Sequence, residues 1–328
     1  MNASRPSFIL AGAAAIAFAT VMVASPASAA VLPEGQKITV VEYFETLLSP
    51  EAYSQQWNVS PLDASGTLVG GQHNGITVYS IDVDDDGHGY ATGFVFDDES
   101  GESQLFVADA NTGAFTAPVP IDVPEVDGAF CPGIDYSSGT VFVSCQWEGE
   151  SDFFSFIGTF DVASGVYTPF ITLGDDEGEE AYEFYALATD PTTGQLWTLF
   201  QDSFGDAYAT TVDVEAGELG ESVFLTRTVN GADFDRNGQL FITYEDDAET
   251  LGTLDLDSGA ISPIAPYPFV TSVLTSVNPL TVWGKPALAA TGSSESELVL
   301  PVTLGSALLL LAGAAFVATA RVNRSRTA

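Results

Sequence analysis

Short apolar segments separated by polar turn residues run through the chain from residue 30 to residue 285. The segments are rich in Val, Phe, Tyr, Thr and Gly, and the breaks between them contain Asp, Ser, Asn and Gly. Long stretches with an apolar residue at every third or fourth position, which would indicate amphipathic helices, are missing from this region. The pattern therefore predicts an all-β domain of about 255 residues.

The turns between these segments repeat along the chain. A first series joins an Asp to a Gly three or four residues later and has five members. These members are Asp63–Gly66, Asp109–Gly113, Asp161–Gly165, Asp213–Gly217 and Asp255–Gly259, and their glycines lie 47, 52, 52 and 42 residues apart. In such turns Asp accepts hydrogen bonds from the backbone two residues on, and Gly supplies the positive φ of a tight hairpin.

A second series of turns alternates with the first, and each member precedes a segment that contains an aromatic residue. Its members are Asp84–Gly87, Asp135–Gly139, Asp190–Gly194 and Asp235–Gly238, with a degenerate fifth copy at Ser276–Leu280. Two hairpins in each unit of about 50 residues give four strands per unit, which is the pattern of a β-propeller.

The number of repeats predicts five blades. Six blades are the alternative, because residues 36–62 could contain a further weak copy, and a β-sandwich fits less well because its strands carry no such long repeat. Residues 38–70 are expected to supply one hairpin of the blade that closes the ring, and residues 271–283 the other. The turns resemble those of bacterial quinoprotein-like and lactonase-like propeller families. This resemblance implies the fold and no catalytic residue.

Residues 1–29 have the composition of an export signal. A positive start at Arg5 precedes an apolar run over residues 8–23, and an A-x-A cleavage pattern ends at Ala29. The alternative is a retained membrane anchor, for which the run is short.

The C-terminal region combines a short motif, an apolar span and a basic tail. The motif lies in a polar linker over residues 286–297, the span covers residues 298–320, and arginines mark residues 321–328. As a helix, the span would be about 34 Å long, enough to cross a bilayer. The motif consists of Leu288, Ala289, Ala290, Thr291 and Gly292.

This arrangement resembles the sorting signal of sortase substrates in Gram-positive bacteria, with Ala289 where those proteins usually have Pro. The resemblance implies that a sortase cleaves between Thr291 and Gly292 and joins Thr291 to an amine of the cell-wall peptidoglycan. Before sorting, the span would hold the protein in the membrane. A plain membrane anchor is the alternative, and both interpretations place the domain outside the cell.

The charge balance of the exported part is strongly acidic. The chain has 45 Asp and Glu against 8 Lys and Arg, a formal net charge of −37. Four of the arginines belong to the two ends, so the exported domain keeps only Lys37, Arg227, Arg236 and Lys285. Such a charge disfavours nucleic acid and other anionic partners, attracts cations and favours solubility.

Cys131 and Cys145 are the two cysteines of the chain. In an exported protein such a pair is expected to form a disulfide. Pairing of Tyr136 with Thr140 in a hairpin would put the two cysteines opposite each other on one face. A reactive thiol pair is the alternative, and no His or Lys lies near them in sequence to support it.

Two turns match the Asp-x-Asp-x-Asp-Gly spacing of calcium loops. The candidate ligands are Asp82, Asp84 and Asp86 in the first, and Asp233, Asp235 and Asn237 in the second. Neither has the acidic twelfth residue of an EF-hand. Asp and Asn could instead simply build the turns. Calcium is thus a possible cofactor.

Signals for catalysis are few. His73 and His88 are the only histidines, and no nucleophile elbow or phosphate-binding loop is present. We expect a non-catalytic propeller that binds a protein or glycan ligand at the cell surface. The alternative is a wall-tethered hydrolase of a glycan or lactone, whose acidic residues would converge in the channel. The four tryptophans are expected to pack between blades or to stack on sugar rings.

Overall fold

The computed structural model describes residues 32–44, 53–95, 102–124, 126–149, 152–175, 182–246, 248–268 and 275–285. These residues form five antiparallel sheets. The first sheet contains β21 (Thr275–Trp283), β1 (Lys37–Phe44), β2 (Tyr53–Val59) and β3 (Gly66–Asn74). The second contains β4 (Ile76–Val83), β5 (His88–Val95), β6 (Gln104–Asp109) and β7 (Ala114–Pro120).

The other three sheets follow in chain order. The third contains β8 (Phe130–Ser137), β9 (Thr140–Glu148), β10 (Phe153–Asp161) and β11 (Val166–Asp175). The fourth contains β12 (Tyr182–Thr189), β13 (Leu196–Asp202) and β14 (Ala207–Asp213), with β15 (Glu218–Leu219) and β16 (Val223–Leu225) both paired to β14. The fifth contains β17 (Val229–Phe234), β18 (Leu240–Glu245), β19 (Glu249–Asp255) and β20 (Ala260–Pro266).

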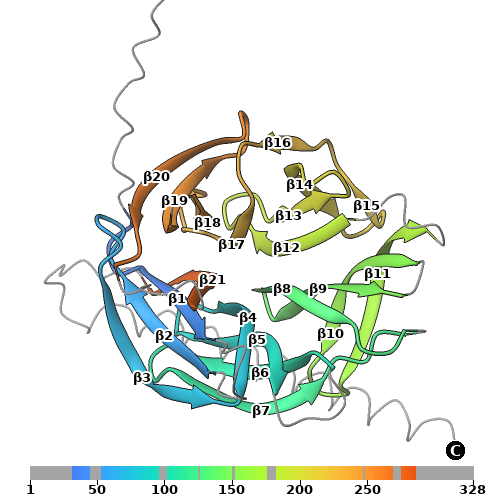
Figure 1. The fold of residues 1–328 in the computed structure, drawn as a ribbon, viewed down its shortest axis with the longest axis horizontal. Helices are drawn as coiled ribbons and strands as arrows, with labels where there is room; N and C mark the ends of the chain where they lie inside the picture. Colours follow the sequence, from blue (N-terminus) through green and yellow to red (C-terminus); the bar gives the residue numbers. More distant parts are fainter. Residues whose placement is uncertain are drawn as a thin grey trace, which may run out of the picture. The chain divides into compact units, whose positions relative to one another are not determined.

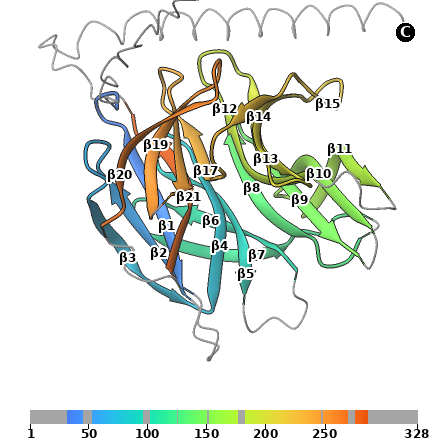
Figure 2. The same ribbon diagram turned by 45° about the horizontal axis from the view of Figure 1, so that its top comes forward.

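The five sheets are the blades of a β-propeller, as the turn repeat predicts (Figure 1). Each innermost strand contacts the innermost strands of the two neighbouring blades, and β21 lies between β17 and β4 (Figure 2). The six-bladed alternative is excluded because residues 37–44 and 53–59 form β1 and β2 of the first blade.

The two ends of the propeller chain close the ring by building one blade together. The C-terminal strand β21 pairs with β1 from Lys37 opposite Trp283 to Phe44 opposite Thr275. Two details of the prediction are wrong: the C-terminal piece supplies one strand rather than a hairpin, and residues 276–280 lie inside β21 rather than in a turn. The physical reason is that the first two strands of this blade come from opposite ends of the chain, so no turn connects them.

The two turn series lie at the same end of the blades. In each four-stranded antiparallel blade, the turns between the first and second strands and between the third and fourth strands fall at one end, which we call the turn end. The connections between the second and third strands, and those between blades, fall at the other end, which we call the loop end.

Most of the turns are built as the sequence predicts, with two exceptions. In the turn between β2 and β3, Gly66 was expected to supply the positive φ, but it begins β3, and Ala64 has the positive φ of 52° instead. At the turn between β6 and β7, Asp109 Oδ1 accepts the Asn111 N–H at 2.8 Å, and Gly113 adopts φ +75°. Asp135 was expected in a turn of this kind, but it lies in β8. Ser138 and Gly139, both with positive φ, make that turn alone, in the manner of a two-residue hairpin.

The apolar core lies between neighbouring blades. One cluster joins Leu105 of the second blade to Val143 and Phe160 of the third, and another joins Ile38 of the first blade to Phe241 of the fifth. Neighbouring blades cover each other's faces. Only the inner edge and the outer edge of each sheet lack a further strand to pair with.

Candidate functional site

The five innermost strands carry a four-residue repeat that lies at the same height in every blade. Its first residue lies at a β-bulge, and its last residue lies close to the turn end. The copies are Tyr79–Asp82, Pro132–Asp135, Tyr185–Ala188, Asn230–Asp233 and Asn278–Thr281. Bulges bend and twist a strand and often lie beside functional sites. The first positions of the five copies form one ring of residues, and the last positions form a second.

The last positions of the repeat form a ring that includes three aspartates. Their carboxylates cross from one blade to the next and accept backbone N–H groups. Asp82 Oδ2 accepts from Tyr136 at 2.5 Å, Asp135 Oδ1 from Thr189 at 2.7 Å, and Asp233 Oδ2 from Val282 at 2.5 Å.

These N–H groups lie on the inner edge of a blade, where no further strand can pair with them. A buried N–H without a partner costs free energy, and a carboxylate is a strong acceptor for it. The aspartate ring therefore fastens neighbouring blades together at the inner edge.

Thr281 occupies the aspartate position of the blade that closes the ring. Its Oγ1 lies 3.0 Å from Asp82 Oδ1 and 3.1 Å from Asp233 Oδ2. A hydroxyl carries a single proton and can donate to only one of the two carboxylates. The second contact becomes a hydrogen bond when that carboxyl group is itself protonated.

The pKa values of the ring agree with a protonated carboxyl group beside Thr281. Burial, together with the negative charges of Asp233 and Asp135, raises the pKa of Asp82 well above its ordinary value. Burial also raises the pKa of Asp135 to about 6 and that of Asp233 to about 7. The ring therefore retains protons close to neutral pH.

The ring does not follow from the sequence pattern, which favours other roles for its members. The spacing predicts a turn at Asp135, and candidate calcium loops at Asp82 and Asp233. The available signal was the strand pattern before each turn, in which a small residue and an aliphatic residue precede the aspartate, as in Ser80-Ile81-Asp82 and Gly133-Ile134-Asp135.

The candidate calcium ligands have separate hydrogen-bond partners. Asp84 Oδ1 accepts the N–H groups of Asp86 and His88, at 2.8 and 3.1 Å, and Asp86 forms an ion pair with Lys285.

In the second loop, Asp235 Oδ1 accepts the N–H of Asn237 at 2.9 Å and that of Gln239 at 2.8 Å. Asp82 and Asp233 belong to the ring. Within the described ranges no three acidic, His or Cys side chains are arranged to hold a metal. Calcium binding stays a prediction. If calcium binds the folded protein, it should raise the melting temperature, and a chelator should reverse the rise.

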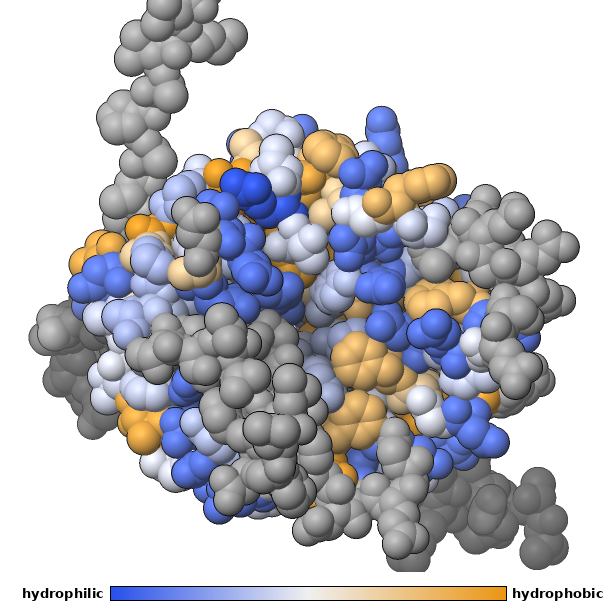
Figure 3. Space-filling model, viewed as in Figure 1, coloured by the Kyte–Doolittle hydropathy of each residue, from blue (hydrophilic) through white to orange (hydrophobic). Residues whose placement is uncertain are grey.

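The bulge positions and the strand ends near them bring aromatic side chains together towards the loop end. Tyr79 at its bulge meets Phe94 at a ring distance of 5.3 Å and Phe130 at 4.7 Å, both edge to face. All three rings are partly exposed. On the face seen in Figure 3, hydrophobic side chains lie beside the centre of the ring, near β8 and β9, among hydrophilic ones.

A polar group lies at the corresponding height of the fourth blade. The Tyr185 hydroxyl contacts a carboxylate oxygen of Glu183 and, at 2.9 Å, the amide oxygen of Gln201. Burial, followed by the effect of Glu183, raises the pKa of Tyr185. The tyrosine is therefore a neutral hydrogen-bond donor, and the site offers a carboxylate and an amide to a ligand.

The four tryptophans lie in different surroundings. Trp283 is buried in the closing blade, Trp57 donates its Nε1–H to Glu42 at 2.8 Å, and Trp197 packs against the core between the fourth and fifth blades. Trp147 is partly exposed near the loop end and stacks on Phe154. Packing or a side-chain hydrogen bond thus accounts for the first three, although Trp57 and Trp197 are partly exposed like Trp147.

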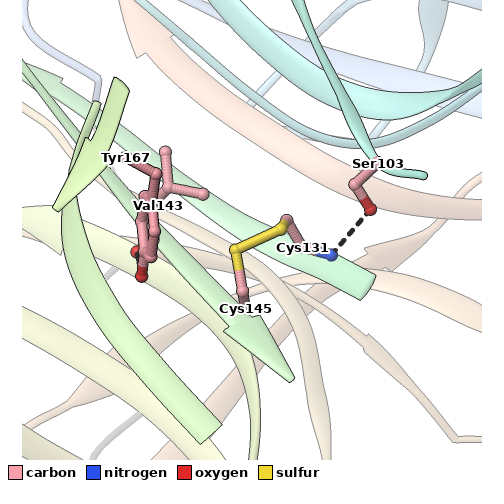
Figure 4. The surroundings of a disulfide bond; sticks show 5 residues. All are labelled: Ser103, Cys131, Val143, Cys145 and Tyr167. Carbon is pink, nitrogen blue, oxygen red and sulfur yellow. Dashed lines mark hydrogen bonds between the residues drawn. A yellow bond between two sulfur atoms is a disulfide. The ribbon is translucent and has the colours of Figure 1, made fainter. Parts of the chain in front are cut away.

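The predicted disulfide between Cys131 and Cys145 is confirmed (Figure 4). The predicted register is wrong, because Tyr136 pairs with Val141 instead of Thr140. A bulge that includes Cys131 shifts β8 by one residue and restores the two cysteines to opposite positions. The Cys131 N–H also donates to Ser103 Oγ of the second blade at 2.9 Å, so the bonded hairpin is joined to its neighbour.

The sorting motif, Leu288 to Gly292, and the apolar span of residues 298–320 lie outside the described residues. Among the described residues, no helix is long and apolar enough to cross a membrane.

Comparisons with known proteins assign neither a family nor a function to the chain. No protein-family model and no curated protein matches the chain. A protein of unknown function from Dyadobacter fermentans is similar in structure, with 11% identity over 71% of this chain and 82% of that chain, at a TM-score of 0.47. The Dos1 propeller shows 14% identity over 65% of this chain and 54% of its own, at a TM-score of 0.35.

A puromycin-hydrolyzing peptidase from Mycobacterium tuberculosis shows 11% identity over 70% of this chain, at a TM-score of 0.38. This chain spans 38% of the peptidase chain.

Proposed function

We propose that this protein is an exported, cell-wall-anchored surface protein whose propeller binds a ligand at its loop end without catalysing a reaction. Sortase would join Thr291 to the peptidoglycan, and the membrane would hold residues 298–320 before that step. The observation that carries the proposal is the point at which the chain leaves the propeller.

The last described residues lie against two turns of the turn end. The Arg236 side chain, from the turn between β17 and β18, donates to the Gly284 carbonyl oxygen. The Lys285 ammonium group forms an ion pair with Asp86, in the turn between β4 and β5. A chain that continues to a wall attachment at Thr291 thus starts from the turn end, and the loop end is presented away from the wall.

The loop end has the chemistry of a site for a neutral or cationic glycan. Tyr79, Phe94 and Phe130 offer aromatic surface on which a sugar ring can stack, and Glu183 and Gln201 offer planar polar groups to sugar hydroxyls. A formal net charge of −37 disfavours anionic glycans.

A glycan array of neutral and amino sugars, probed with the exported chain, tests this function. We expect binding that is lost in Tyr79→Ala and in Glu183→Gln. Leu62→Ala is the matched control, because Leu62 is 72% exposed in a turn at the opposite end. Absence of binding to every glycan, or equal loss in the control, would contradict the proposal.

A wall-tethered hydrolase of a glycan or lactone is the second candidate, and the aspartate ring favours it. Asp82, Asp135 and Asp233 lie close enough for their charges to interact, and their pKa values are raised, as an acid catalyst requires. Each carboxylate, however, already accepts a backbone N–H of another blade. Turnover of a lactone or glycoside that disappears in Asp233→Asn, with the fold retained, would establish the hydrolase in place of the binding module.

A further inference from the structure

Three of the four cationic side chains of the exported domain lie around one short segment. The Lys37 ammonium group lies 4.4 Å from the centroid of the Trp283 ring, Arg236 donates to the Gly284 carbonyl, and Lys285 pairs with Asp86. In a domain with so few positive charges, three of them contact residues 283–285 or belong to that segment.

Neutral contacts at the same segment involve the first and second blades. The indole Nε1–H of Trp283 donates to Thr39 Oγ1 at 2.8 Å, and this indole is 3% exposed. A Cβ atom at Gly87 would lie 2.7 Å from the Trp283 ring, so the turn between β4 and β5 sits directly on the indole.

The same strand is also held from the fifth blade. The Val282 N–H donates to Asp233 Oδ2 at 2.5 Å, while Thr281 contacts both Asp233 and Asp82. Residues 281–285, which we call the exit clamp, therefore contact the first, second and fifth blades.

The geometry points to a mechanical role: the exit clamp resists pulling force and holds β21 in the ring when the tether to the wall is under tension. This inference rests on the proposed anchoring of the chain, because an unanchored protein would carry no load at this point. A ligand held at the loop end and a tether at the turn end would pull the propeller in opposite directions.

Such a force would act along β21. The strand pairs with β1 over its whole length, so its ladder hydrogen bonds would be loaded together in shear instead of opening one after another. The contacts of Trp283, Gly284 and Lys285 lie at the end where the force enters, so they would be loaded together with the ladder and would have to break before the strand could slide.

Equilibrium stability alone does not explain this arrangement of charges. The side chains of Lys285 and Asp86 are 62% and 56% exposed, and exposed ion pairs contribute little to folding. Loss of this pair should change the unfolding equilibrium by less than about tenfold. Under load, the same contacts resist the first displacement of the strand.

Single-molecule force spectroscopy tests the exit clamp directly. The exported chain would be attached to a surface through Phe204→Cys, which replaces a side chain that is 89% exposed in the β13–β14 turn at the loop end. It would be pulled through a handle joined after Thr291. We expect the double variant Arg236→Met, Lys285→Ala to unfold at a lower mean force than the parent, with a urea midpoint close to that of the parent.

Arg227→Ala is the matched control. It also removes a positive charge, but Arg227 pairs with Asp246, at 3.0 Å, near the loop end. Its unfolding force should equal that of the parent. Equal forces in the double variant and the parent, or an equal loss in the control, would overturn the inference.

A second pulling geometry distinguishes a local loss of the exit clamp from a loss of stability of the whole propeller. When the handle is moved to the outer turn of the fifth blade by Asp257→Cys, the double variant should unfold at the parent's force. A loss of force in this geometry too would mean that the variant is merely unstable. Failure of the clamp would leave wall anchoring untouched, since anchoring is measured separately by the C-terminus of the wall-released protein.

Discussion

Replacement of Asp135 by Asn should remove much of the dependence of stability on pH. Asp135 is 2% exposed, and its carboxylate accepts the Thr189 N–H at 2.7 Å and the Thr189 hydroxyl at 2.8 Å. An Asn side chain keeps one oxygen acceptor for the N–H, and its NH₂ group can donate to the hydroxyl oxygen. The variant therefore retains the link between the blades and loses the ionisation.

The sign and size of the effect follow from the pKa. Burial raises the pKa of Asp135 from 3.8 to about 6 in the folded protein. A raised pKa contributes stability that is fully present below pH 3.8 and is lost as the pH rises through 6. A difference of about two pKa units corresponds to a loss of about 3 kcal/mol between pH 4 and pH 7.

The neighbouring carboxyl groups add to the effect in the same direction. The negative charge of Asp135 contributes to the raised pKa of both Asp82 and Asp233. Asp135→Asn removes that charge, so their pKa values should fall and their own losses of stability should shrink. The difference between variant and parent is accordingly expected to be at least as large as the contribution of Asp135 alone.

Urea unfolding at a series of pH values from 4 to 8 measures this prediction. Urea leaves the ionic strength unchanged, and the midpoint and slope at each pH give the free energy of unfolding. The parent should lose stability as the pH rises, and Asp135→Asn should lose about 3 kcal/mol less. Asp257→Asn makes the same charge change at an exposed turn and should follow the parent.

A variant that keeps the parent's full pH dependence would refute the role of the ring. A parent that gains stability between pH 4 and pH 7 would refute the sign of the argument.

Two further predictions concern the turns and the disulfide. Gly113→Ala should lower the free energy of unfolding by about 3 kcal/mol or more, because its Cβ would lie 2.3 Å from the Val69 carbonyl oxygen. Gly139→Ala has open space around its Cβ and should lower it by about 1–2 kcal/mol, for the positive φ alone. Equal urea midpoints for the two variants would contradict the close contact between blades. The double variant Cys131→Ser, Cys145→Ser should lose roughly 3 kcal/mol in stability, since the bond closes a loop of 14 residues; an unchanged melting temperature would show that the bulge and the bond to Ser103 hold the hairpin without it.

The sequence was sufficient to predict the blades, but it did not predict the aspartate ring. Hairpin turns are local, so Asp109 and Gly113 reveal their role by composition and spacing alone. The ring bonds join residues far apart, such as Asp135 and Thr189, which are 54 positions apart. The small and the aliphatic residue before Asp135 mark it as a strand residue, but they do not show which distant residue its carboxylate contacts.

Bulges set a second limit on what the sequence could predict. A bulge inserts one residue into a strand and changes the register without a clear sequence signal. The disulfide was predicted correctly with the wrong register because the bulge at Cys131 cancels a one-residue error at the turn. The aromatic grouping of Tyr79, Phe94 and Phe130 likewise depends on a bulge and on the juxtaposition of two blades.

The most direct test of the anchored-propeller account is mass spectrometry of wall-released protein from cells with and without their sortase. The account predicts a C-terminus at Thr291 joined to a peptidoglycan fragment, and the loss of this species in the sortase mutant. Protein with an intact C-terminus in the membrane fraction of both strains would contradict wall anchoring, and with it the load that the exit clamp is proposed to bear.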